Sequence, residues 1–268
     1  MKLKRILLLI ILAGGWHFVL ESLAAEENSL QTGRDVFEAM EARQAFTDES
    51  ATLTMELINA KGQVRTRKME SYSMEDENGL KKSMIIFTYP ADVKGMGLLT
   101  LENETGDTDQ WLYLPRSKKE RRIVSRQKSE SFAGSDFNYE DLEIRDIDDN
   151  TYTLVGQKQI ADRNCFQIEV IPKPEVKSAY SKQICWIDSE RLVMLKCEFY
   201  DHDNHHFKTL TASDVRLVSN TTDRWRAYRV VMEDHTDHHR TVLTMENLRV
   251  NSGLTAGQFT LRYLKRQH

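Results

Sequence analysis

The sequence predicts a mainly β protein built on one large, curled antiparallel sheet. Most of the chain after residue 50 alternates apolar and polar residues with a period of two, which is typical of strands that bury one face. Short polar turns such as Asn78-Gly79 separate the alternating segments. Helical spacing is confined to residues 28–46, so the alternating strands and helices of a doubly wound α/β fold are not expected.

The first 24 residues have the pattern of a secretory signal peptide. Basic residues at positions 2, 4 and 5 precede an apolar run, and Ser22-Leu23-Ala24 supplies small residues before a cleavage site. The apolar run is roughly 15 residues long, shorter than the ~20 of a spanning helix, although an uncleaved anchor is the alternative. We therefore expect residues 1–24 to be removed and residues 25–268 to form one exported domain.

The elements follow in a regular order after this segment. Residues 28–46 are expected to form an amphipathic helix with Leu30, Phe37 and Met40 near helical spacing. The strand candidates that follow are 52–57, 63–74, 82–89, 97–103, 109–114, 120–125, 151–157, 164–171, 181–188, 191–200, 206–218, 225–233 and 240–249. A sheet with this many strands must curl or close into a barrel.

A curled sheet with one apolar face can enclose a hydrophobic cavity. The residues predicted to line that cavity are Leu53, Met55, Leu57, Met84, Ile86, Trp111, Tyr113, Trp186, Val193 and Leu195. Residues 126–150 break the period of two and are rich in Ser, Asp and Glu, so they are interpreted as an irregular lid. The lid would cover the cavity with Phe132, Phe137 and Tyr139. Ordinary core packing is the alternative for each of these residues.

Three cysteines, Cys165, Cys185 and Cys197, lie in predicted strands, and no CxxC motif is present. Simple hairpin registers place Cys165 opposite Ile187 and Cys185 opposite about Met194, so no two cysteines face each other. An exported chain meets an oxidising compartment, where disulfides can form. Buried free thiols and one disulfide therefore both remain open.

The sequence contains none of the common catalytic motifs, such as GxSxG, HExxH or a P-loop. We therefore expect neither an enzyme nor a cofactor. The formal net charge of −4 disfavours a nucleic-acid partner. Two similar turns are rich in histidine and aspartate and are weak candidates for a Zn, Cu or Ni site, with ordinary polar turns as the alternative. Their histidines are His202, His205, His206, His235, His238 and His239.

A basic run contrasts with the acidic composition of the whole chain. It consists of Arg116, Lys118, Lys119, Arg121 and Arg122 and surrounds a predicted hairpin turn. A solvated turn is the simple interpretation. The alternative is a docking patch for anionic head groups or an acidic partner protein.

Five segments of the chain are distinctive when taken together, namely Asp109–Pro115 (DQWLYLP), Arg121-Arg122-Ile123, Phe132–Leu142 (FAGSDFNYEDL), Pro90–Gly95 (PADVKG) and Thr241-Val242-Leu243. Together they resemble the outer-membrane lipoprotein-sorting protein family of the LolA-like superfamily. The resemblance covers roughly residues 30–260. It implies an incomplete antiparallel β-barrel around an N-terminal helix and a lid, enclosing a hydrophobic cavity.

The resemblance also implies a function, namely a monomeric periplasmic carrier of lipoprotein or lipid cargo that serves an RND-type or other inner-membrane exporter and contacts the membrane surface transiently. The residues agree with this function, because a shuttle must hide acyl chains from water at roughly 0.8 kcal/mol per buried methylene. Methionine-rich strands such as those around Met55 and Met84 can adapt to different chains. The alternatives are an exporter accessory protein that binds no lipid and a histidine-rich metal-binding protein.

Overall fold

A computed structural model of the chain describes residues 30–105, 108–144, 146–219 and 221–266. The predicted signal peptide and its cleavage site lie outside the described residues. The strands are β1 (Asp48–Ile58), β2 (Val64–Glu75), β3 (Lys81–Tyr89), β4 (Gly97–Glu102), β5 (Thr108–Leu114), β6 (Lys119–Ile123), β7 (Asn150–Ile160), β8 (Arg163–Pro172), β9 (Lys182–Asp188), β10 (Met194–Tyr200), β11 (His206–Leu217), β12 (Trp225–Asp234) and β13 (His239–Val250).

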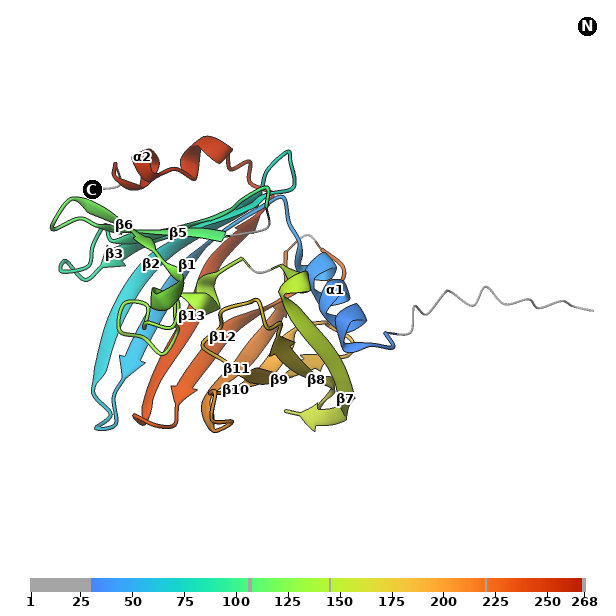
Figure 1. Cartoon of the computed structure of the whole chain (residues 1–268). Coiled ribbons are helices and arrows are strands. Elements are labelled where there is room, and N and C mark those ends of the chain that lie inside the picture. The colour runs from blue at the N-terminus through green and yellow to red at the C-terminus, as the bar shows by residue number, and fades with distance from the viewer. Residues whose placement is uncertain (1–29, 106–107, 145, 220, 267–268) are drawn as a thin grey trace, which may run out of the picture. The chain divides into compact units, whose positions relative to one another are not determined.

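These strands form one antiparallel 13-stranded sheet in the order β6-β5-β4-β3-β2-β1-β13-β12-β11-β10-β9-β8-β7. Neighbours in space are neighbours in sequence, except that β1 pairs with β13 at the centre, where Leu53 faces Met245. The sheet curls strongly (Figure 1). The predicted curled antiparallel sheet is confirmed. The sheet stays open, in agreement with the predicted incomplete barrel, because β6 and β7 end it and do not pair with each other, so no closed β-barrel forms.

The sheet has two covered faces. On the inner face, Phe87 packs against aromatic residues of the lid. The outer face is the one from which Ile86 packs against the C-terminal residues. Successive side chains of a strand point to opposite faces, which explains why neighbouring residues of β3 belong to different cores. Figure 1 shows the C-terminal segment lying across β3 to β5 on the side opposite the lid.

Helix α1 (Gly33–Gln44) is shorter than the predicted helix at both ends. Thr32 and Asp35 form a capping box that satisfies backbone N–H groups at its start. Gly33 lets the helix approach the sheet closely, because a Cβ there would lie 2.9 Å from Ile168 Cγ2 and 3.0 Å from the backbone of Tyr152. The helix therefore rests directly on β7 and β8.

The lid and the C-terminal segment are the two coverings made of irregular chain. The lid runs from residue 124 to 149, without residue 145, and contains the short 3₁₀ helices η1 (Ser125–Gln127), η2 (Glu140–Leu142) and η3 (Ile147–Asp149). This agrees with the predicted irregular insertion. The C-terminal segment, residues 251–266, contains η4 (Ala256–Gln258) and α2 (Leu261–Leu264). The sequence pattern did not predict this segment or its helix.

The cysteines lie in a register that differs from the prediction. Cys185 faces Cys197 directly, and Cys165 faces Asp188. A β-bulge between Met194 and Lys196 adds one residue to β10 and shifts the pairing that follows. All three thiols are buried and free in this structure. Burial raises the pKa of the Cys165 thiol to about 11 and raises that of Cys197 as well, so both stay protonated at neutral pH.

The described residues from Gln31 onward form one compact unit. That a single domain begins at residue 25 stays a prediction. In the described part of the chain, no helix has both the length and the apolar character that crossing a membrane requires.

Candidate functional site

The residues predicted to line one cavity lie on both faces of the sheet. Three of them are in the inner core with the lid, namely Leu53, Met55 and Leu57. Four are beneath the C-terminal segment, namely Met84, Ile86, Trp111 and Tyr113. The remaining three form a separate cluster, namely Trp186, Val193 and Leu195. The structure therefore does not bring these residues together around one space.

The lid fills the inner face of β1 to β5. The ring of Phe132 lies 5.7 Å from that of Phe87 and 5.8 Å from that of Tyr139, measured between centroids. Gln110 Nε2 donates a hydrogen bond of 3.0 Å to the Tyr139 carbonyl, and Arg67 donates to the Ala133 carbonyl. This half of the inner face is a packed core, so Phe132 and Tyr139 cover no open space.

An apolar cavity of about 600 Å³ lies at the other half of the inner face, bounded by α1, the lid and strands β7 to β12. Its size is within the range of ~300–1,000 Å³ that is common for small-molecule sites. Phe137 is the one predicted lid residue that lines it. Its other apolar lining residues are Phe37, Met40, Ile147, Tyr152, Val170, Met194, Phe199, Leu210 and Met232. Its polar lining residues are Glu41, Gln44, Glu140, Asp141, Glu143, Asp146, Asn150 and Gln183.

Helix α1 forms one wall of the apolar cavity and is held at its C-terminal end. Its aromatic residue Phe37 stacks on Tyr152 of β7 with ring centroids 4.6 Å apart. Gln44 Nε2 donates a 2.8 Å hydrogen bond to the Leu192 carbonyl. Arg226 donates in turn to the Gln44 carbonyl at 2.5 Å. Helix α1 thus presents apolar side chains to the cavity and is held by hydrogen bonds at its C-terminal end.

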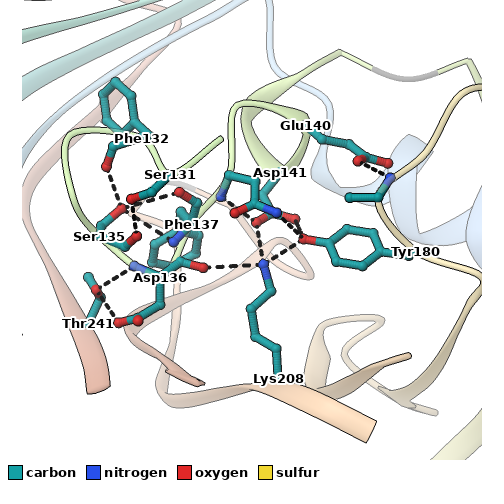
Figure 2. A network of polar contacts seen from close by, with 12 residues as sticks. Ser131, Phe132, Ser135, Asp136, Phe137, Glu140, Asp141, Tyr180, Lys208 and Thr241 are labelled. Atoms are coloured by element: carbon teal, nitrogen blue, oxygen red, sulfur yellow. Dashed lines mark hydrogen bonds and ion pairs between the residues drawn. The ribbon is translucent and has the colours of Figure 1, made fainter. Parts of the chain in front are cut away.

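A buried polar network ties the lid to the sheet (Figure 2). Lys208 of β11 is 2% exposed, and its Nζ lies 2.9 Å from Asp141 Oδ2. The same Nζ donates to the Tyr180 hydroxyl at 2.5 Å and to the Asp136 carbonyl at 3.2 Å. Tyr180 donates from its hydroxyl to Asp141 Oδ1 at 2.7 Å. A buried ammonium is tolerated because it is paired and hydrogen-bonded on several sides.

Two further acidic residues of the lid are also bound by neighbouring segments. Asp136 accepts hydrogen bonds from the Thr241 hydroxyl at 2.6 Å and lies 2.8 Å from His239 Nδ1, both on β13. Glu140 accepts from the backbone N–H of Ala179 at 2.6 Å and from the Ser178 hydroxyl. Through these contacts, the acidic residues of the FAGSDFNYEDL segment all bind the lid to the sheet and to the loop before β9.

Sequence reasoning identified that segment by its letters and missed the residues that bind it. Tyr180 and Thr241 carry no sequence signal of their own. Lys208 differs from a solvent-facing lysine only because it occupies a position of β11 where alternation predicts an apolar residue. The single available signal was the concentration of carboxylates beside aromatic residues in the lid, which requires partners wherever the lid is buried.

The predicted docking patch lies on the hairpin of β5 and β6. Arg122 pairs with Asp109, and Arg121 Nη2 lies 3.9 Å from Glu130 Oε2. Arg116, Lys118 and Lys119 have no ion-pair partner in the described part of the chain. The structure therefore places the patch on one exposed hairpin, with part of its charge compensated.

The histidines of the two turns do not converge on one site. His206 and His235 are side by side with ring centroids 4.8 Å apart, and the Nε2 atoms of both lie 2.8 Å from Thr209 Oγ1. His239 instead binds the lid through Asp136.

The other three histidines lie apart from that pair. His202 Nε2 lies 3.1 Å from the Ser178 carbonyl, and His238 occupies an exposed turn. Asp201, Asp203 and His205 place one ligand atom each within 4.8 Å of one another, the one such group among the described residues. These three residues are the part of the predicted metal site that the structure brings together.

A family model described as an uncharacterized protein matches residues 79–266. No curated protein matches the chain. Among solved structures, a domain from Vibrio parahaemolyticus described as an outer-membrane lipoprotein-sorting protein domain is 35% identical, with a TM-score of 0.81, 87% of this chain covered and 98% of that one. A DUF1329 family protein from Desulfovibrio piger is 29% identical, with a TM-score of 0.81, 87% of this chain covered and 97% of that one.

A LolA superfamily protein from Nitrosomonas europaea shares the fold at 19% identity, with a TM-score of 0.69, 87% of this chain covered and 99% of that one. The open curled sheet, the helix on its inner face and the lid are thus features of a known architecture. The match to the Vibrio domain extends this likeness to the sequence. The chain belongs to the outer-membrane lipoprotein-sorting protein family.

Proposed function

We propose that the chain is a periplasmic carrier that holds an acyl chain of a lipoprotein or lipid in the apolar cavity and moves it between membranes. The observation that carries the proposal is the apolar cavity of about 600 Å³ beneath α1 and the lid. The description of the Vibrio relative as a lipoprotein-sorting protein domain supports the same class of cargo. Each methylene that enters such a space contributes about 0.8 kcal/mol.

The cavity is suited to holding an acyl chain for two reasons. The strands β10 to β12 give it an apolar floor, and the lid, which forms its roof, is bound to the sheet by polar contacts. Leu210 and Met232 face each other across β11 and β12 at the floor. Met194 and Phe199 add adaptable and aromatic surface from β10. The buried ion pair of Lys208 and Asp141 holds the roof in place while the chain is enclosed.

Filling the floor of the cavity tests the proposal. Leu210→Trp places an indole in the space that we assign to the chain. If the indole excludes three methylenes, affinity for a fluorescent acyl probe should fall by about 2.4 kcal/mol, or roughly fiftyfold. The measurement is a probe titration by fluorescence, accompanied by urea unfolding to show that the variant is folded.

The matched control adds the same side chain elsewhere. Val155 of β7 is 57% exposed and does not line the cavity, so Val155→Trp should leave probe affinity unchanged. The carrier function is contradicted if the wild-type protein binds no acyl probe, or if folded Leu210→Trp binds as tightly as the wild type.

We also propose that the basic hairpin mediates contact with a membrane surface or with an inner-membrane exporter. The support is the cluster of exposed cations in the turn after β5 and on β6, in a chain with a net charge of −4. Anionic head groups attract such clusters by about 1 kcal/mol for each basic residue near the surface.

A further inference from the structure

A second, polar cavity of about 440 Å³ adjoins the apolar one. It lies between the lid, the loop after β8 and the end of β4, and most of its wall is polar. The carboxylates that line it are Glu140, Glu143, Asp146, Asp149 and Glu175. Two lysines, Lys128 and Lys177, also line it.

The two cavities share part of their walls. Glu140, Glu143, Asp146 and Asn150 line both of them, so the two spaces lie side by side at these residues. A ligand with an apolar chain and a polar head would meet both environments. The arrangement is that of a ligand site with an apolar body and a small number of polar groups at one end.

Asn150 is an independent indication that a polar group belongs here. Its side chain is 6% exposed, and its Oδ1 has no hydrogen-bond partner among the described residues. Buried amide oxygens are normally satisfied, because an unpaired one costs about 1–3 kcal/mol. A donor from a bound ligand would satisfy it after a small side-chain adjustment.

We propose that the polar cavity receives a cationic head group, an ammonium or guanidinium group, of an amphiphile whose apolar chain occupies the apolar cavity. This inference rests on the proposed carrier function and specifies the chemistry of its cargo.

The charge of the polar cavity selects the sign of the head group. Its described lining residues supply five carboxylates and two ammonium groups, and Lys128 already pairs with Glu143 at 2.5 Å. Arg145 lies outside the described residues and is not counted. An incoming cation gains carboxylate partners in a partly desolvated space, whereas a phosphate or carboxylate head group would be repelled. Ammonium and guanidinium groups also carry the N–H donors that Asn150 Oδ1 can accept.

Three probes with the same alkyl chain and different head groups test the inference. One carries a primary ammonium, one a hydroxyl and one a carboxylate. The ammonium probe should bind roughly tenfold more tightly than the hydroxyl probe, and the carboxylate probe should bind most weakly. Raising the salt concentration should reduce the differences in affinity among the three probes, because the site is partly open to solvent.

A charge reversal tests the same site from the protein side. Glu175 is exposed, and its side chain has no hydrogen bond or ion pair among the described residues, so Glu175→Lys should leave the fold intact. The substitution should lower the affinity for the ammonium probe, raise the affinity for the carboxylate probe and leave the affinity for the hydroxyl probe unchanged. The matched control is Glu77→Lys in the turn between β2 and β3, which lines neither cavity and should change none of the three affinities.

The cation can come from an amine-bearing lipid or from a basic residue beside an acylated one. An acylated lysine dipeptide that binds more tightly than the alkylammonium probe would indicate the peptide source, and the reverse order would indicate the lipid source. Equal affinity for all three head groups, or a preference for the carboxylate, would overturn the inference and leave the carrier function standing. If no probe binds, the carrier function fails and the inference fails with it.

Discussion

Lys208 is the residue on which the polar contacts of the lid converge. Its Nζ has three partners, and two of them, Asp136 and Asp141, belong to the lid. The charge is almost fully removed from water, so its pairing determines whether the lid can close over the sheet. Sequence patterning could not reveal this, because Lys208 occupies an inner-face position of β11 where alternation predicts an apolar residue.

Removing the ammonium should therefore be costly. In Lys208→Met, Asp141 stays buried without its cationic partner, and the free energy of unfolding should fall by about 3–5 kcal/mol. Urea unfolding followed by fluorescence measures the loss. The double variant Lys208→Met with Asp141→Asn removes both charges and should recover part of it.

An exposed ion pair provides the control. Arg216 and Asp214 pair at 2.5 Å on the surface, and Arg216→Met should leave the unfolding midpoint unchanged because solvent screens such pairs. A Lys208→Met protein as stable as the wild type would show that the network does not hold the lid.

At the scale of elements, periodicity in the sequence was sufficient to predict the strands of the sheet, but it was insufficient to predict the segments that cover the sheet. The strands were predictable because each alternates over several residues and ends in a polar turn. Ile85 and Ile86 show where alternation fails, since β3 is apolar on both faces and the sequence cannot tell which face packs against the lid. The bulge in β10 that pairs Cys185 with Cys197 likewise has no sequence signature.

The C-terminal segment is the covering that the sequence did not predict, and Gly97 on β4 is the point where it packs most closely. A Cβ at this position would lie 2.3 Å from Leu264 Cδ1 and 2.9 Å from the Ile85 carbonyl oxygen. Gly97→Ala must therefore push α2 away from the sheet, and we expect a loss of about 1–3 kcal/mol. Thermal unfolding measures the loss, and limited proteolysis should show faster cleavage within residues 251–260.

Gly156 on β7 is the matched control, because a Cβ there would meet nothing within 4 Å. Gly156→Ala should leave both the melting temperature and the proteolysis pattern close to those of the wild type. If Gly97→Ala behaves in the same way, α2 is not held against β4 as the structure shows.

At the scale of the whole molecule, charge is divided between two places. The polar cavity is lined by five carboxylates and two lysines, whereas exposed cations gather on the β5–β6 hairpin. The hairpin could be recognised in the sequence because its basic residues are consecutive. The polar cavity could not, because its charged residues come from the lid and the loop after β8, which only the fold brings together.

The basic hairpin should determine how strongly the protein binds an anionic surface. Replacing Arg116, Lys118 and Lys119 with Glu should abolish sedimentation with vesicles that contain anionic lipid, since each basic residue contributes about 1 kcal/mol. Lys61→Glu, in the turn after β1, is the control for a single exposed lysine. Equal binding of the triple variant and the wild type would exclude the hairpin as the contact, and acyl-probe affinity should be unchanged in all of these proteins.

The pairing of β1 with β13 has a consequence for the order in which the chain can acquire its structure. Met55 faces Leu243, so β1 cannot pair with β13 at the centre of the sheet until β13 has been synthesised. Asp136 of the lid likewise waits for Thr241. Until then the aromatic residues of the lid and the apolar side of both half-sheets stay exposed, as is usual for topologies dominated by distant contacts. A nascent chain that stops before residue 239 therefore exposes apolar surface to chaperones and proteases, and β13 is the strand that completes the sheet.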